Sequence, residues 1–333
     1  MDYENFNNQR IGEILSEFGN PQELTVLYVS TYLSDYVRTE TALDILRRNR
    51  IKVATILIGN KRFKYFLAVF KTILKLRKCD VIFLAFRSHE ILPFFRFITR
   101  KPIIFDAFVS LYETLCLERK IFKSGSLLAK ASKRYDAYLC RIADLVLVDT
   151  KAHCDYFKKE FNAKNISYLY LECNKTLFKP LSIEKAHNRF VVFWYGKCWP
   201  LQGADIILKA AKLLERQPEI TFHLVGPVRR KYKDLVDELN PKNIEFIEHV
   251  PYDKLPLEIA RADLCLGGHF SALLKAQMVI PGKAFQFIAC GKKTILGDNS
   301  ANRELFSEAE NLYFVRMNSE EELAKRILEI WLS

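Results

Sequence analysis

The sequence predicts an α/β protein built from two Rossmann-like domains, and three observations support this prediction. Short runs rich in β-branched and aromatic residues alternate with longer segments that have helical spacing. This alternation is typical of parallel sheets, because a crossover connection must join successive parallel strands. The chain has 333 residues, which is enough for two domains, and 50% of them are hydrophobic, which excludes a disordered chain.

The first domain is predicted over residues 1–180. Its strands are expected at 24–29, 53–58, 81–86, 103–108, 145–148 and 166–171. Its helices are expected near 38–50, 61–78, 89–99, 127–142 and 151–162. Residues 174–180 are interpreted as the linker that leads to the second domain.

The second domain is predicted over residues 181–333, with its last helix free to pack back on the first domain. Its strands are expected at 190–195, 220–225, 244–247, 264–266 and 293–296. Its helices are expected near 204–216, 230–239, 253–261, 283–290 and 319–332. Ligands of such sheets bind beyond the carboxyl ends of the strands, so we expect a site in a central cleft between two facing domains.

Composition excludes several other classes of protein. No apolar run approaches the roughly 18–20 residues that a membrane-spanning helix needs. The first ten residues carry two acids and lack the basic start and apolar core of a signal peptide. The eight cysteines are scattered without zinc-like spacing, so we expect no metal site and no disulfide framework. These features predict a cytoplasmic protein.

Charge is distributed unevenly along the chain. Residues 1–180 hold 30 Lys and Arg against 19 Asp and Glu, a net charge of +11, whereas residues 181–333 have a net charge of +1. Anionic lipid headgroups, phosphorylated substrates and nucleic acid are the possible partners of the basic half. A role in solubility alone would spread the positive charge over both domains, so we expect the first domain to meet an anionic membrane surface.

The segment 61–78 separates into an apolar stripe and a basic face at helical spacing. The basic face carries four lysines, Lys64, Lys71, Lys75 and Lys78. The segment is interpreted either as a helix packed by its apolar stripe with a solvated basic face, or as a contact for anionic lipid. No RNA-binding motif is present, so no nucleic acid partner is expected.

Two loops at predicted strand ends carry candidate binding residues. After the strand at 190–195, Gly196 and Gly203 allow close backbone approach to a ligand, and Lys197 adds positive charge beside the start of a helix. Lys283 lies in the first turn of another helix, where a cation is disfavoured unless an anion sits beside it. It is interpreted either as an anion ligand or as a lysine that points to water. His269 follows the strand at 264–266, where it would either touch a ligand or be an ordinary loop residue.

The segment GKCWPLQGADIILKAAKLL resembles the signature of group 1 (retaining, family 4) glycosyltransferases, which have the GT-B fold. The segments ITFHLVGP, IEFIEHVPYDKLP, IARADLCLG and PGKAFQFIACGKKTILGD follow in the family's order and spacing, so the resemblance spans roughly 190–315. It extends more weakly to KPIIFDAFVSLYET, ADLVLVDT and NKTLFKP in the first half. The resemblance implies a donor-binding second domain and an acceptor-binding first domain.

Several residues match positions that bind the nucleotide-diphosphate sugar in that family. Lys197 matches the basic residue that contacts the diphosphate, and Gly203 matches the glycine that opens the helix. Val250 and Tyr252 lie in the loop that usually meets the nucleobase. Lys283 fits a subset of the family that has a P-x-K-x-F stretch here.

Other positions depart from the family pattern. Gln202 replaces a second lysine, and Met278 and Gln286 replace the paired glutamates. Gln286 is still able to hydrogen-bond ribose hydroxyls, whereas Met278 cannot hold the sugar. Phe108 is near the place of the usual first-domain histidine, so Asp106 is the nearest polar candidate for orienting the acceptor hydroxyl or accepting its proton, or is simply a structural aspartate. The other histidines, among them His153 and His187, show no metal or triad spacing.

These observations predict a hexosyltransferase that uses Lys197, Lys283 and Asp106 as its catalytic residues. It would move a sugar from a UDP- or GDP-linked donor to a glycan or lipid-linked acceptor, in the synthesis of cell-surface polysaccharide or glycoconjugate. The resemblance implies retention of configuration without a metal or a cofactor. We expect the protein to work peripherally at the inner face of the membrane. Two alternatives remain: a partner subunit without turnover, and another nucleotide-sugar enzyme such as an epimerase.

Overall fold

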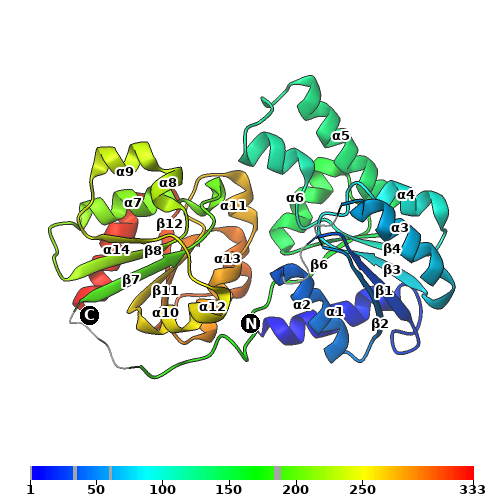
Figure 1. Cartoon of the computed structure of the whole chain (residues 1–333), viewed down its shortest axis with the longest axis horizontal. Helices are drawn as coiled ribbons and strands as arrows, with labels where there is room; N and C mark the ends of the chain where they lie inside the picture. Colours follow the sequence, from blue (N-terminus) through cyan, green and yellow to red (C-terminus); the bar gives the residue numbers. More distant parts are fainter. Residues whose placement is uncertain (1, 33–35, 60–61, 184–188) are drawn as a thin grey trace. The chain divides into compact units, whose positions relative to one another are not determined.

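A computed structural model describes residues 2–32, 36–59, 62–183 and 189–333 of the chain. The chain divides into two compact units, Met1–Glu172 (unit 1) and Cys173–Ser333 (unit 2), so the division falls just before the predicted linker. Each unit is built on a parallel six-stranded sheet with helices packed on it (Figure 1). The predicted α/β class with two Rossmann-like domains is confirmed.

Unit 1 contains every strand that the sequence predicts for it. The strands are β1 (Thr25–Ser30), β2 (Lys52–Leu57), β3 (Val81–Leu84), β4 (Ile103–Asp106), β5 (Leu145–Val148) and β6 (Ile166–Tyr168). The helices are α1 (Tyr3–Ser16), α2 (Val37–Arg48), α3 (Lys64–Lys75), α4 (Leu92–Ile98), α5 (Leu127–Ile142) and α6 (Lys151–Phe161), with a 3-10 turn η1 (Leu76–Lys78) and a π-helix η2 (Glu113–Glu118). The sequence does not predict α1, which Asp2 caps through the backbone N–H groups of Glu4 and Asn5.

The sheet of unit 1 has the strand order β2-β1-β3-β4-β5-β6. Side chains of a strand alternate between its two faces. Leu27 and Val29 of β1 therefore join the core beneath α3, α4, α5 and α6, whereas Val26 and Tyr28 join the core beneath α1 and α2. The strand order reverses between β1 and β3, and this switch point is where a doubly wound sheet binds its ligands.

Unit 2 also contains every predicted strand, together with one that the sequence does not predict, β12. The strands are β7 (Phe190–Tyr195), β8 (Ile220–Val225), β9 (Ile244–Ile247), β10 (Leu264–Gly268), β11 (Lys293–Asp298) and β12 (Leu312–Arg316). The helices are α7 (Ala204–Leu213), α8 (Val228–Lys231), α9 (Lys233–Leu239), α10 (Leu255–Arg261), α11 (Leu274–Met278), α12 (Gly282–Ala289), α13 (Ser300–Leu305) and α14 (Glu320–Leu332), with the 3-10 turns η3 (Pro200–Gln202) and η4 (Tyr252–Lys254).

The sheet of unit 2 has the strand order β12-β11-β10-β7-β8-β9, which is the Rossmann order. Its switch point lies between β7 and β10, whose loops carry most of the predicted site residues. The last helix, α14, packs against α7 of the same unit and buries Leu323, Ile327 and Ile330 in the core there. The buried side of α14 is therefore occupied within unit 2.

Helix α3 exposes its apolar stripe, so the interpretation of 61–78 as a helix packed by that stripe is wrong. Only Ala68 and Thr72 of α3 are buried, and they lie on the opposite side of the helix from the aromatic residues. Because Ala68 and Thr72 have small side chains, α3 approaches the sheet closely on that side. Its large apolar side chains face solvent on the other side. We use the term α3–α4 surface for the exposed Phe63, Phe66, Phe70, Ile73, Leu74, Phe94 and Phe97 with Lys64, Lys71, Lys75 and Lys78. Residue 61 lies outside the described part of the chain.

All eight cysteines of the chain are free and buried. Among the described residues, no helix has both the length and the apolar character that crossing a membrane requires.

A close approach between two loops of unit 2 makes Gly226 sensitive to substitution. Gly226 has a φ of +126°, and a Cβ atom there would lie 2.0 Å from the carbonyl oxygen of Gly196. We expect Gly226→Ala to lower the free energy of unfolding by at least about 2 kcal/mol, through strain and displacement of the loop after β7. Urea denaturation measures the change.

The control is Gly12→Ala in helix α1, where a Cβ atom meets nothing within 4 Å. This substitution should stabilise the protein by about 0.5–1 kcal/mol, because alanine favours helix. Equal effects of the two substitutions would contradict the steric argument.

Candidate functional site

Three segments of unit 2 converge at the carboxyl ends of β7 and β10: the loop after β7, the loop after β10, and the start of α12. The backbone N–H of Phe270 donates to the carbonyl of Gln202 at 3.4 Å, and the hydroxyl of Ser271 donates to the carbonyl of Leu201 at 3.0 Å. Gly203 permits this contact, since a Cβ atom there would lie 2.7 Å from the backbone nitrogen of Ser271. The two loops therefore form one continuous rim at the switch point.

Lys283 is buried at this rim and does not point to water. Its Nζ donates to the carbonyl oxygen of Tyr195, the last residue of β7, at 2.6 Å, and lies 4.2 Å from the centroid of the Trp194 ring. Burial lowers the pKa of Lys283 to about 7, because a desolvated ammonium is disfavoured. An anion bound beside Lys283 would restore its charge.

Gln286, on the next turn of α12, joins two tyrosines. The hydroxyl of Tyr195 donates to Oε1 of Gln286, and Nε2 of Gln286 donates to the hydroxyl of Tyr252 at 3.1 Å. An amide can do both, because it carries an acceptor and a donor, whereas a carboxylate only accepts. The sequence does not predict Tyr195 as a site residue, although its position at the strand end could have indicated it.

The remaining predicted residues lie at the edge of this cluster. Lys197 is exposed, and its carbonyl accepts a hydrogen bond from Nζ of Lys231 at 2.8 Å. The side chain of Gln202 turns back on its own loop, where Oε1 accepts from the backbone nitrogen of Trp199 at 3.0 Å. Gly196 approaches this side chain closely, since a Cβ atom there would lie 2.9 Å from the same Oε1. Val250 is half-buried in the loop before η4.

His269 is buried in the loop after β10, and its Nδ1 has no hydrogen-bond partner. Burial and the positive charges of Lys283 and Lys275 lower the pKa of His269 to about 3, so the ring is neutral at physiological pH. Among the described residues, no group of three or more His, Cys, Asp and Glu side chains is placed to hold a metal ion.

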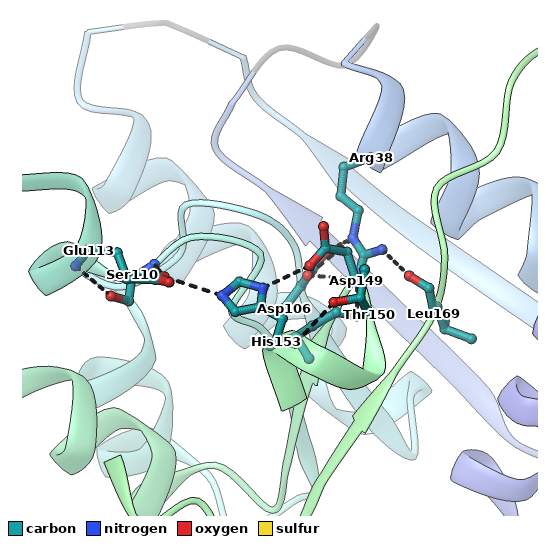
Figure 2. A network of polar contacts seen from close by, with 9 residues as sticks. Arg38, Asp106, Ser110, Glu113, Asp149, Thr150, His153 and Leu169 are labelled. Carbon is teal, nitrogen blue, oxygen red and sulfur yellow. Dashed lines mark hydrogen bonds and ion pairs between the residues drawn. The ribbon is translucent and has the colours of Figure 1, made fainter. Parts of the chain in front are cut away.

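In unit 1, Asp106 lies at the end of β4 in a buried ion pair with Arg38 of α2 (Figure 2). Both side chains are at most 1% exposed, and Nε and Nη2 of Arg38 donate to the carboxylate at 3.0 and 3.1 Å. The other guanidinium bonds go to the carbonyls of Leu169 and Val148. This geometry matches a structural aspartate, and a part in orienting the acceptor stays a prediction.

His153 is part of a second buried group of charges, although no triad spacing in the sequence indicates it (Figure 2). Its Nδ1 lies 2.7 Å from Oδ1 of Asp149 and its Nε2 lies 3.2 Å from Oε2 of Glu113. Burial disfavours the charged ring, but the two carboxylates outweigh it and raise the pKa of His153 to about 9. His187 lies outside the described residues.

An aromatic cluster follows β1, β3 and β4, at the switch point of unit 1. The rings of Tyr36 and Phe86 are stacked with centroids 4.8 Å apart, and Tyr32 and Phe108 meet Phe86 edge-on. The guanidinium carbon of Arg38 lies 5.4 Å from the centroid of Phe108, which links this cluster to the ion pair with Asp106. The sequence does not indicate this cluster, since its members come from three separate loops.

We predict that the contribution of His153 to stability depends on pH. A folded-state pKa near 9, above the unfolded value of about 6.5, contributes stability that is present below pH 6.5 and is lost as the pH rises through 9. The loss of unfolding free energy in His153→Gln should therefore be largest near pH 6.5 and shrink by up to about 3 kcal/mol toward pH 9. Denaturant unfolding of both proteins at each pH measures this difference.

The control is His223→Gln on β8, because the partner of His223, Glu245, is exposed. An ion pair with an exposed member contributes little, so this variant should show a small and nearly constant change. A loss in His153→Gln that does not vary with pH would contradict a protonated His153.

Comparison with known proteins finds a family model that matches unit 2 of the chain. Residues 178–333 match the family model described as "Glycosyl transferases group 1". No curated protein sequence matches the chain. Among solved structures, that of Anabaena HepE in complex with UDP-glucose is similar over 92% of this chain and 89% of that one, at 18% identity and a TM-score of 0.64.

Two further solved structures share the same architecture. Sucrose-phosphate synthase from Thermosynechococcus elongatus is similar over 99% of this chain and 84% of that one, at 16% identity and a TM-score of 0.64. WaaG, a glycosyltransferase involved in lipopolysaccharide biosynthesis, is similar over 92% of this chain and 90% of that one, at 14% identity and a TM-score of 0.62. Residues 178–333 therefore belong to the group 1 glycosyltransferases, and the chain is a glycosyltransferase with the two-domain architecture of the GT-B fold.

Proposed function

We propose that this enzyme transfers a sugar from a nucleotide-diphosphate sugar to a glycan or lipid-linked acceptor, with retention of configuration and without a metal. Unit 2 holds the donor and unit 1 holds the acceptor. The observation that carries the proposal is the buried Lys283 at the switch point of unit 2, hydrogen-bonded to the end of β7. The similarity to a protein crystallised with UDP-glucose favours a UDP-linked donor.

The chemistry that this arrangement supports is departure of a nucleoside diphosphate. The bond between the sugar C1 and the diphosphate oxygen breaks, the acceptor oxygen bonds to C1, and the acceptor proton is released. Lys283, Lys197 and the amino terminus of α7 offset the negative charge that builds on the leaving group. Tyr252 and Val250 lie where the nucleobase would bind, and the amide of Gln286 positions Tyr195 and Tyr252.

We propose that the acceptor binds at the aromatic cluster of unit 1. Tyr32, Tyr36 and Phe86 lie at the β1–β3 switch point, and ring faces of this kind stack on the apolar faces of sugars. Asp106 is fully buried and holds Arg38, whose guanidinium lies 5.4 Å from the centroid of the Phe108 ring, so its proposed role is to fix the cluster that positions the acceptor.

Donor binding tests the proposal, with UDP and GDP titrated into the full chain by calorimetry. We expect Lys283→Met to weaken nucleoside diphosphate binding about 10-fold or more, because charge-assisted bonds to phosphate are strong. Since the free enzyme holds the pKa of Lys283 near 7, binding should take up a proton and weaken as the pH rises above 7. That pH dependence should be smaller in Lys283→Met.

Lys197→Ala should also weaken binding, and exposed Lys233→Met on α9 should not. Release of nucleoside diphosphate from donor sugars, with glycolipid acceptors supplied, then measures turnover. A wild-type protein that binds neither UDP nor GDP would refute the proposed function, and unchanged affinity in both lysine variants would refute the assignment of the site.

The α3–α4 surface leads us to propose that unit 1 docks on the anionic inner face of a membrane. Phe66 and Leu74 are 70% and 67% exposed, and Phe97 is 91% exposed. The lysines of α3 lie together on another face of the helix. Exposed aromatic residues beside basic ones are typical of segments that lie in the headgroup region. Each basic residue near such a surface contributes about 1 kcal/mol.

Sedimentation with vesicles of graded anionic lipid content tests this proposal. Binding should increase with anionic lipid and fall at high salt, because charge attraction is screened. Changing Lys64, Lys71, Lys75 and Lys78 to Glu should abolish sedimentation and leave UDP binding unchanged. The matched control changes four exposed lysines of the same unit, Lys151, Lys158, Lys159 and Lys164, to Glu. Binding that is indifferent to anionic lipid and salt, or equal losses in the two variants, would defeat the proposal.

A further inference from the structure

The loop after β7 contains a residue in a strained conformation. Cys198, which lies between Lys197 and Trp199, has a φ of +53° although it is not a glycine. Residues with a Cβ atom rarely adopt this left-handed conformation, because the side chain crowds the backbone. Such a conformation persists where contacts from the surrounding structure hold it. The contacts made by the two neighbours of Cys198 therefore indicate what holds the loop.

The side chain of Lys231, the last residue of α8, contacts the loop on both sides of Cys198. Its Nζ donates a hydrogen bond to the carbonyl oxygen of Lys197 at 2.8 Å. The same Nζ lies 4.7 Å from the centroid of the Trp199 ring, which is within the range of a cation–π interaction. One ammonium group therefore joins the residue before the strained position to the residue after it.

The segment that carries Lys231 is itself packed closely against the start of this loop. Gly226 approaches Gly196 so closely that a Cβ atom at Gly226 would lie 2.0 Å from the carbonyl oxygen of Gly196. Helix α8 begins at Val228, just beyond this contact. Lys231 thus reaches the loop from a short helix whose start is fixed against the same loop.

We propose that Lys231 is a positioning residue for the donor's diphosphate, which acts by fixing the backbone from which the side chain of Lys197 extends. Lys231 holds the loop, and Lys197 makes the contact with phosphate. Binding is stronger when less of the loop has to be ordered by the ligand, so a loop that is fixed beforehand favours affinity. The inference rests on the proposed function, since Lys197 belongs to the proposed donor site.

Titration of UDP into the full-length Lys231→Met variant by calorimetry tests the proposal. Methionine keeps the unbranched side chain and removes the ammonium group, and we expect the affinity for UDP to fall about 3- to 10-fold. Lys231→Arg should bind UDP within about 2-fold of the wild type, because a guanidinium also donates hydrogen bonds and lies over aromatic rings. The matched control is Arg230→Met, which removes the same charge from an exposed residue of the same helix and should have no such effect.

A double-mutant cycle distinguishes a positioning residue from a second ligand of the phosphate. If Lys231 acts through Lys197, adding Lys231→Met to Lys197→Ala should lower the affinity for UDP by less than about 2-fold further. If Lys231 contacts the ligand itself, the two losses should instead multiply. A multiplied loss would overturn the proposal.

Amide hydrogen exchange, measured by mass spectrometry without any ligand, reports on the loop directly. Lys231→Met should speed the exchange of residues 196–203, and Arg230→Met should not, because local opening of a segment depends on the contacts that hold it. Unchanged exchange in Lys231→Met would show that the loop does not need this lysine. Faster exchange throughout unit 2 would show a general loss of stability. Either result would overturn the proposal.

The remaining outcomes separate this inference from the proposed function. If the wild type and Lys231→Met bind UDP equally, Lys231 does not position the donor and the proposed function stands. If the wild type binds neither UDP nor GDP, the proposed function fails, and the role of Lys231 toward a donor fails with it.

Discussion

The proposed donor site depends on one buried positive charge, that of Lys283 at the end of β7. Lys283 donates to the backbone carbonyl of Tyr195, which fixes α12 against the strand but supplies only a partial negative charge. Unit 1 encloses its buried cations differently, because Arg38 and His153 are surrounded by the carboxylates of Asp106, Asp149 and Glu113. The buried cations of unit 1 therefore have carboxylate partners, whereas Lys283 of unit 2 donates to a carbonyl oxygen, which leaves it suited to binding an anion.

The two switch points explain why the chemistry lies on loops that are far apart in sequence. In each unit the strand order reverses next to the first strand, so the loops after β1 and β3, and after β7 and β10, diverge and leave room for a ligand. Aromatic rings occupy this place in unit 1, and lysines with glycine-rich turns occupy it in unit 2. The same architecture therefore presents a surface suited to sugar rings in one unit and to phosphate in the other.

Much of the fold could be predicted from the sequence, because buried parallel strands appear as short continuous apolar runs. The strand Phe190–Tyr195 has the predicted bounds, and Gly291, with a φ of +69°, lies just beyond α12 as a helix-ending glycine should. The orientation of α3 could not be predicted, since helical spacing identifies two faces but not which one meets the sheet. One partner of His153 was also hidden, because Glu113 is 40 residues away in the chain.

The burial of the cysteines has a consequence for how the enzyme tolerates oxidants. Peroxides and disulfides react with the thiolate form, and burial raises the pKa of Cys140 to about 12 and of Cys198 to about 11. All eight thiols are buried. Those of Cys140 and Cys198 are almost entirely protonated near neutral pH, because their pKa values lie far above 7. Cys198 lies in the loop after β7, next to Lys197, so its burial protects that loop from sulfenic acid formation and glutathione attachment. Catalysis by this enzyme should consequently persist through oxidative episodes that inactivate proteins with exposed thiols.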